Sequence, residues 1–212
     1  MDTGLEFLRT RRFGRGIMPP LSDTMRLEAD IRSRIEEFVL PLYTTLDGVQ
    51  TFDRVVRIER RVWELAGDED LDGRLLELLV LFHGVTDRLG SLGRQSRFAL
   101  ILRGLSLPED LIERSRIGLQ RFSEGPETSE ERILHDAWLL EESGLRAVVA
   151  RLLMAGRRRW TVERALETLG PGPVAERFYT SAGAATATRR RQEVAAWIDG
   201  LRRSLRQETP DS

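Results

Sequence analysis

Apolar residues recur with a period close to 3.6 along most of the chain, and no useful length alternates with a period of two. This pattern predicts an all-α protein, and no internal repeat divides it. The predicted helices cover residues 22–41, 52–66, 72–87, 96–103, 145–153, 161–169 and 189–206, with two more that begin near residues 108 and 128. We expect residues 21–207 to fold as one compact domain.

The helix predicted over residues 72–87 differs from the others, because apolar residues surround it instead of forming one stripe. The apolar positions are Leu75, Leu76, Leu78, Leu79, Val80, Leu81, Phe82 and Val85. We therefore expect it to be the buried centre of the domain. It also carries His83, with Asp87 one turn later on the same helical face.

Local signals mark several helix ends. Ser22 or Asp23 can cap the first helix, and Pro41 is expected to end it. Thr128 and Glu131 have the spacing of a capping box. Residues 1–20 mix glycine, arginine and proline without periodicity and predict a flexible tail, and residues 208–212 predict a disordered C-terminus.

Composition removes several classes of chemistry. The chain has no cysteine, which excludes disulfides, a zinc ribbon and a thiol nucleophile. All 33 basic residues are arginine, so a Schiff-base lysine and a P-loop are excluded as well. The most apolar uncharged stretch, residues 78–86, is too short to span a bilayer and lacks the flanks of a signal peptide. We expect a cytoplasmic protein without membrane contact.

Charge is distributed unevenly. The chain has a net charge of −1, yet residues 146–206 contain thirteen arginines and five acids, a net +8. This predicts a basic contact surface, for which an acidic protein or a second copy is a better partner than nucleic acid. The densest basic clusters are Arg157, Arg158 and Arg159, and Arg189, Arg190 and Arg191.

Only two histidines are available for chemistry, His83 and His135, and His135 precedes Asp136. A single histidine on an apolar helix is more often a hydrogen-bonded core residue than a ligand. The scarcity of histidine therefore excludes most metal and triad arrangements.

Three ordered segments nevertheless resemble the HD superfamily of metal-dependent phosphohydrolases, in particular its small bacterial all-helical members. Residues 52–58 (FDRVVRI) are similar to the family's first helix, in which a His follows an Asp and precedes Val. Residues 81–88 (LFHGVTDR) resemble its "LHD" segment, and residues 130–141 (EERILHDAWLLE) resemble its segment E-A-K-I-L-Q-D-A-D-R-L-D, which ends in Gly. The C-terminal arginine-rich helix is also similar to the last helix of these small bacterial members. The resemblance spans residues 51–206 and implies an HD-like helical domain.

In this family a first His, a His-Asp pair and a late Asp hold a divalent metal whose bound water attacks a phosphate ester. By resemblance, these four positions fall on Arg54, His83, Gly84 and Trp138. Only His83 could coordinate a metal, since glycine has no side chain, tryptophan only donates and arginine stays cationic. We therefore expect no bound Mn, Mg or Fe and interpret the chain as a catalytically degenerate binding or regulatory protein.

Alternatives stay open at this stage. A rebuilt site could still hydrolyse a nucleotide or another phosphate ester with a divalent metal. The dipeptide His135-Asp136 could be the true metal pair, although no late Asp of the right kind follows it. If the site is vestigial, Arg54 is expected either to occupy the vacated metal position and neutralise Asp87 and Asp136, or to point to solvent.

Overall fold

A computed structural model describes residues 26–44, 52–67, 69–90, 92–122, 125–170 and 172–208. This part of the chain contains α-helices, two short 3-10 helices and no strand, so the predicted all-α class is confirmed. The α-helices are α2 (Ala29–Thr44), α3 (Phe52–Ala66), α4 (Gly73–Phe82), α5 (Arg97–Gly104), α6 (Glu109–Arg121), α7 (Ser129–Glu141), α8 (Gly144–Arg157), α9 (Val162–Glu167) and α10 (Ser181–Glu208). The 3-10 helices are η2 (Thr86–Arg88) and η3 (Ala175–Arg177).

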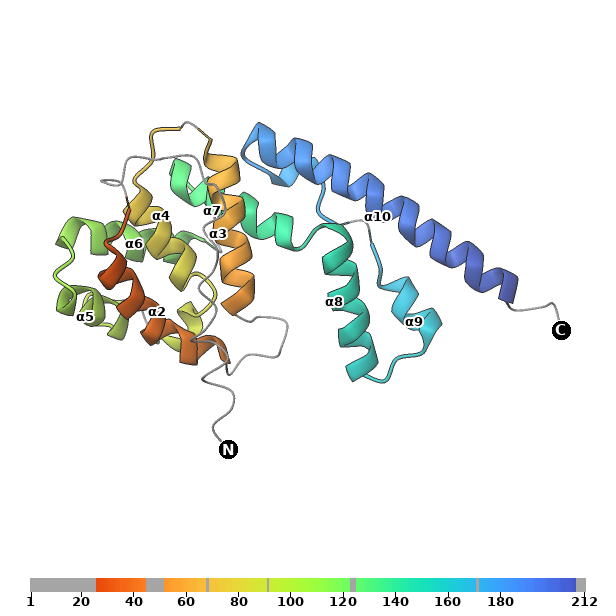
Figure 1. The fold of residues 1–212 in the computed structure, drawn as a ribbon, viewed down its shortest axis with the longest axis horizontal. Coiled ribbons are helices and arrows are strands. Elements are labelled where there is room, and N and C mark those ends of the chain that lie inside the picture. The colour runs from red at the N-terminus through yellow and green to blue at the C-terminus, as the bar shows by residue number, and fades with distance from the viewer. Residues whose placement is uncertain are drawn as a thin grey trace.

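Helices α2, α3, α5, α6 and α7 surround α4, and these six helices form the main body of the protein (Figure 1). Every residue of α4 except Arg74 is buried, as the surrounding apolar pattern predicts. Phe82, at the end of α4, meets the ring of Phe98 edge to face, with centroids 4.9 Å apart. The main body is therefore organised around the helix that carries His83 at its C-terminal end.

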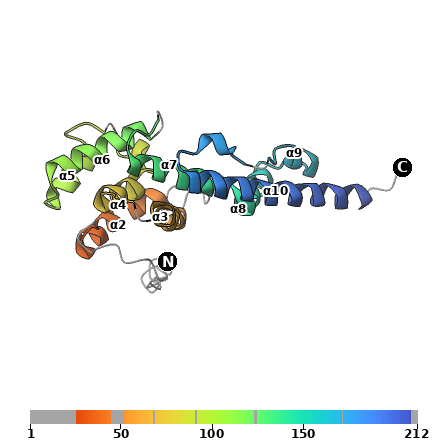
Figure 2. The same cartoon turned by 90° about the horizontal axis from the view of Figure 1, so that it is seen from above.

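Helices α8, α9 and α10 form an extension that projects away from the main body, with α10 as its longest element (Figures 1 and 2). Here a second, much smaller apolar cluster joins α8 and α10, made of Val148, Leu169, Val194 and Ile198. From the sequence we expected one compact domain, and this second apolar cluster was not predicted.

Several helix boundaries agree with the sequence signals. Thr128 and Glu131 form the capping box in both directions. Helix α3 begins and ends where the periodicity places it, and Gly67 follows it with a φ of +53°, a conformation that favours glycine. Asp72 accepts hydrogen bonds from the first amides of α4.

Two helix ends differ from the prediction. Helix α2 continues through Pro41 to Thr44, because burial of Tyr43 outweighs the one backbone hydrogen bond that proline cannot form. Helix α10 begins at Ser181, eight residues before the predicted start at 189, because its first turns carry alanine and glycine instead of a clear apolar stripe.

Helix α4 also ends earlier than predicted, at Phe82 instead of residue 87. The next helical hydrogen bond would join the Gly84 amide to the Val80 carbonyl. Both groups have other partners: the Gly84 amide donates to Tyr43 Oη at 3.2 Å, and His83 Nδ1 lies 2.7 Å from the Val80 oxygen. The chain therefore turns at residue 84.

The predicted tail at 1–20, the cap at Ser22 or Asp23 and residues 209–212 lie outside the described residues. Within the described ranges, no helix is both long enough and apolar enough to cross a bilayer.

Candidate functional site

Helices α3, α4 and α7 pack against one another and carry the four positions that the resemblance assigned to metal ligands. Arg54 lies in the first turn of α3, His83 and Gly84 follow the last turn of α4, and Trp138 lies in α7. The contacts of each residue show what occupies this region of the fold.

His83 is a buried, neutral histidine. Its Nδ1 lies 2.7 Å from the Val80 carbonyl oxygen, so Nδ1 must carry the proton and Nε2 the lone pair. Burial, together with the positive charge of Arg54, lowers the pKa of His83 to about 4 despite the hydrogen bond to Val80, which favours the charged form.

Gly84 has no room for a side chain. A Cβ atom built at residue 84 would lie 2.9 Å from both Cε1 and Oη of Tyr43. The Tyr43 hydroxyl is fixed at this point, because it accepts from the Gly84 amide and donates to the Leu81 carbonyl at 3.1 Å. The space into which a carboxylate from position 84 would project is therefore filled by Tyr43.

Trp138 belongs to a cluster of rings between α4, α6 and α7. Its ring lies 5.7 Å from that of Phe122 and 6.3 Å from that of His135, measured between centroids. Phe122 in turn meets the His83 ring edge to face at 5.6 Å. Aromatic packing therefore surrounds His83 on the side where the family places its last carboxylate.

Arg54 is only 14% exposed and forms an ion pair with Glu142, with Nη2 and Oε1 2.5 Å apart. One turn later, Arg57 Nε lies 2.8 Å from Glu141 Oε2. Two arginines on one face of α3 thus hold two consecutive acids at the end of α7. The spacing of three residues on α3 was the sequence signal that could have identified this pairing.

The expected pairing of Arg54 with Asp87 and Asp136 is wrong. Because α4 ends at Phe82, Asp87 no longer shares a helical face with His83 and lies exposed in η2. Asp136 is fully buried, and its carboxylate accepts from the Tyr179 amide at 2.9 Å and from the amide and hydroxyl of Thr180 at 2.7 Å each. Arg54 has Glu142 as its partner instead.

Asp136 fixes the start of α10. Burial alone would raise the pKa of its carboxyl, but the contact with His135 and the hydrogen bonds from residues 179 and 180 hold that pKa below its usual range. His135 Nδ1 lies 3.6 Å from Asp136 Oδ1 and has no hydrogen-bond partner. Because the Asp136 oxygens already have three donors, the alternative in which His135-Asp136 holds a metal is not favoured.

The family's metal does not fit these residues. Position 84 cannot carry a ligand without displacing Tyr43, position 54 carries a cation, and position 138 carries an indole. Across the described ranges, no group of three or more His, Asp or Glu side chains could hold a metal ion. Tyr43 and Glu142, which largely decide this arrangement, were missed by sequence reasoning.

The basic clusters are only partly a free surface. Arg157, Arg158 and Arg159 are exposed at the end of α8, and Arg189 is exposed on α10. Arg190, in contrast, donates to the Leu140 carbonyl at 2.6 Å, and Arg191 donates to the Gly172 carbonyl at 2.7 Å. These two arginines hold α10 in place, so they are not available as the predicted contact surface.

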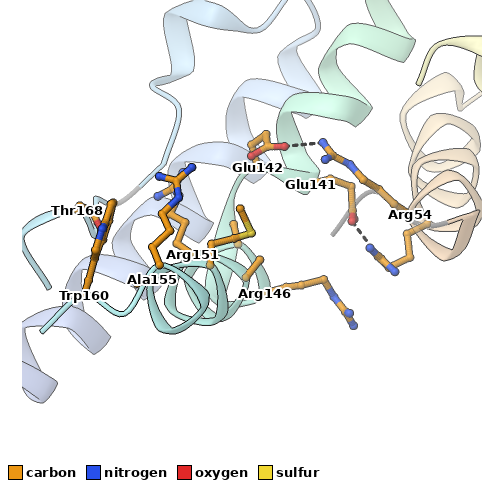
Figure 3. A pocket seen from close by; sticks show the side chains of 13 residues that line it. Arg54, Glu141, Glu142, Arg146, Arg151, Ala155, Trp160 and Thr168 are labelled. Atoms are coloured by element: carbon orange, nitrogen blue, oxygen red, sulfur yellow. Dashed lines mark hydrogen bonds and ion pairs between the residues drawn. The ribbon is translucent and has the colours of Figure 1, made fainter. Parts of the chain in front are cut away.

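A pocket of about 310 Å³ lies between α3, the end of α7, α8 and the segment that follows α8 (Figure 3). Five arginines and two glutamates line it, together with Ala147, Ala150, Met154, Ala155, Trp160 and Thr168. The charged lining residues are Arg54, Arg57, Glu141, Glu142, Arg146, Arg151 and Arg158. The lining therefore has a net charge of +3 around an apolar floor.

A scan against protein-family models found no match to this chain, and a search of curated proteins found none either. Solved structures share the fold. The Lin1889 protein of Listeria innocua is 17% identical with a TM-score of 0.65, covering 84% of this chain and 96% of its own. Bacillus subtilis YpgQ, solved in complex with ADP, is 15% identical with a TM-score of 0.60, covering 85% and 96%. A Lactobacillus plantarum protein is 17% identical with a TM-score of 0.62, covering 85% and 99%. At these identities the likeness establishes the fold alone.

Proposed function

We propose that the chain is a catalytically degenerate HD-like protein that works as a binding or regulatory module. The observation that carries this proposal is the position of Tyr43, whose ring and hydroxyl fill the space beside Gly84. A phosphohydrolase of the HD type needs a carboxylate there to hold the metal, and this chain has no room for one.

The nature of residue 54 also supports the proposal. Arg54, whose charge lowers the pKa of the His83 imidazole, stands at the position that the resemblance gives to the first histidine ligand, and a guanidinium cannot coordinate a metal. The arginine-lined pocket is the candidate site for binding by this module.

The alternative is a phosphohydrolase with a rebuilt site. It receives support from the fold alone, since YpgQ, one of the similar structures, was solved with ADP. The arrangement around His83 favours the interpretation that the metal site is degenerate. An assay for hydrolysis therefore distinguishes the two proposals.

The decisive experiment measures metal content and hydrolysis on the same purified protein. We expect less than about 0.1 equivalent of Mn, Fe or Zn by elemental mass spectrometry, and no hydrolysis of ADP or p-nitrophenyl phosphate above background with added Mn²⁺. His83→Ala is the matched control. One equivalent of metal, or Mn-dependent hydrolysis, that disappears in His83→Ala would refute the proposal.

A further inference from the structure

The pocket between α3 and α8 is separate from the degenerate metal region. None of His83, Gly84, Asp136 and Trp138 lines it, although Arg54 borders both. Figure 3 shows Arg54, Glu141 and Glu142 on one side of the pocket and Trp160 and Thr168 on the other, with Arg146 and Arg151 on α8 between them.

Two of the five arginines are neutralised inside the lining, because Glu142 pairs with Arg54 and Glu141 with Arg57. The other three, Arg146, Arg151 and Arg158, have no carboxylate partner within the described ranges. Arg151 donates only to the Gly170 carbonyl, at 3.2 Å. Three arginines that have no carboxylate partner in the described part of the chain therefore line one pocket.

Arginines of the main body behave differently, because many pair with acids. Examples are Arg32 with Glu36 and Glu59, Arg103 with Glu109, Arg116 with Glu113, and Arg121 with Glu127. The high arginine content of the chain alone does not account for the pocket, since helix α8 and the turn after it contain no acid between residues 144 and 162.

The far wall of the pocket is held by a costly backbone turn. Helix α8 ends in a Schellman motif, in which the Trp160 amide donates to the Ala155 carbonyl and the Arg159 amide to the Gly156 carbonyl. Arg159 adopts a φ of +54°, where glycine is usual. The turn directs Trp160 back to the pocket, where its ring lies 5.3 Å from the Arg158 guanidinium and 4.8 Å from that of Arg164.

We infer that this pocket binds a small anion that carries a phosphate or diphosphate group, with Arg146, Arg151 and Arg158 as its ligands and Trp160 as the positioning residue for Arg158. Guanidinium groups match phosphate oxygens in pairs of hydrogen bonds, and the volume suits a small ligand but not a protein segment. The inference rests on the proposed function, because it names the ligand class of the binding module.

Isothermal titration calorimetry with inorganic pyrophosphate and with ADP tests the site. We expect saturable binding that weakens as salt is raised, and a Kd at least about tenfold higher in Arg146→Gln, Arg151→Gln and Arg158→Gln. Arg60→Gln, an exposed position on α3 outside the pocket, is the matched control and should change the Kd by less than about twofold. Circular dichroism checks that each variant is folded.

The two probes separate the sources of the diphosphate. Tighter binding of ADP than of pyrophosphate indicates a nucleotide, and equal binding indicates the diphosphate group alone. Trp160→Phe should retain binding and Trp160→Ala should weaken it, because only an aromatic ring can hold the Arg158 guanidinium.

Three results would overturn the inference: no saturable binding at millimolar ligand, equal affinity in the three pocket variants and wild type, or tighter binding of citrate or of a polyglutamate peptide than of either probe. Failure of the proposed function is seen separately, because Mn-dependent loss of ADP that requires His83 would show hydrolysis whatever the pocket variants do.

Discussion

The main body and the extension are held together by different forces. The main body has a continuous apolar core around α4, whereas the small cluster of the extension is supplemented by arginines that donate to backbone carbonyls. Arg151, Arg190, Arg191 and Arg202 each donate to the carbonyl of a residue on another segment. The basic character of the C-terminal third is therefore partly structural, because several of its arginines hold segments of the extension together.

Leucine truncation should give the largest effects and distinguish the two regions. Leu79→Ala in α4 is expected to lower the free energy of unfolding by about 4 kcal/mol, because the fully enclosed site cannot collapse around the cavity. Leu169→Ala, in the small cluster, should cost about 2 kcal/mol because its surroundings can relax or admit water. Denaturant unfolding of both variants measures the difference, and equal costs would contradict the comparison.

The pH dependence of stability tests the burial of His83. Its pKa in the folded protein is about 4, below the ordinary value of 6.5, so the unfolded chain binds a proton that the folded state excludes between these pH values. The stabilising contribution is present above pH 6.5 and is lost as the pH falls to 4, by up to about 3 kcal/mol. His83→Gln should flatten this slope in urea titrations, whereas Asp136→Asn should leave it in place.

Packing at Gly84 can be tested by substitution. Gly84→Ala should lower the free energy of unfolding by about 2 kcal/mol, because the added Cβ would meet Tyr43 at 2.9 Å. In a Tyr43→Leu background the same substitution should cost much less. A double-mutant cycle without coupling would show that Tyr43 does not fill this space.

The smallest effect concerns the extension. Arg190→Ala removes hydrogen bonds to the Leu140 carbonyl and the Ser143 hydroxyl and should cost about 1.5 kcal/mol. Its neighbour Arg189, exposed on the same helix, is the matched control, for which alanine should cost less than about 0.5 kcal/mol. Similar values for both would mean that arginine–carbonyl bonds do not hold α10.

The sequence predicted what depends on local pattern. The buried helix α4, the capping box at Thr128 and the limits of α3 follow from periodicity and capping chemistry. Contacts between residues far apart in the chain could not be predicted from the sequence. Nothing local shows that Tyr43 closes the space at Gly84, that Asp136 anchors residues 179 and 180, or that Arg54 selects Glu142.

The charge pattern shows the same limit. A count of arginines identifies the C-terminal third as basic, but it cannot separate Arg190, which bonds to a carbonyl, from Arg158, which lines a pocket. Only the packing of α8 and α10 against α7 makes that distinction.

Anomalous diffraction at the manganese edge, from crystals grown with millimolar Mn²⁺, shows whether His83 binds a metal. We predict no peak within coordination distance of His83 Nε2, with Tyr43 against Gly84 and the Arg54 guanidinium paired with Glu142. A peak at about 2.1 Å from His83 Nε2, with Tyr43 or Arg54 displaced, would contradict this prediction.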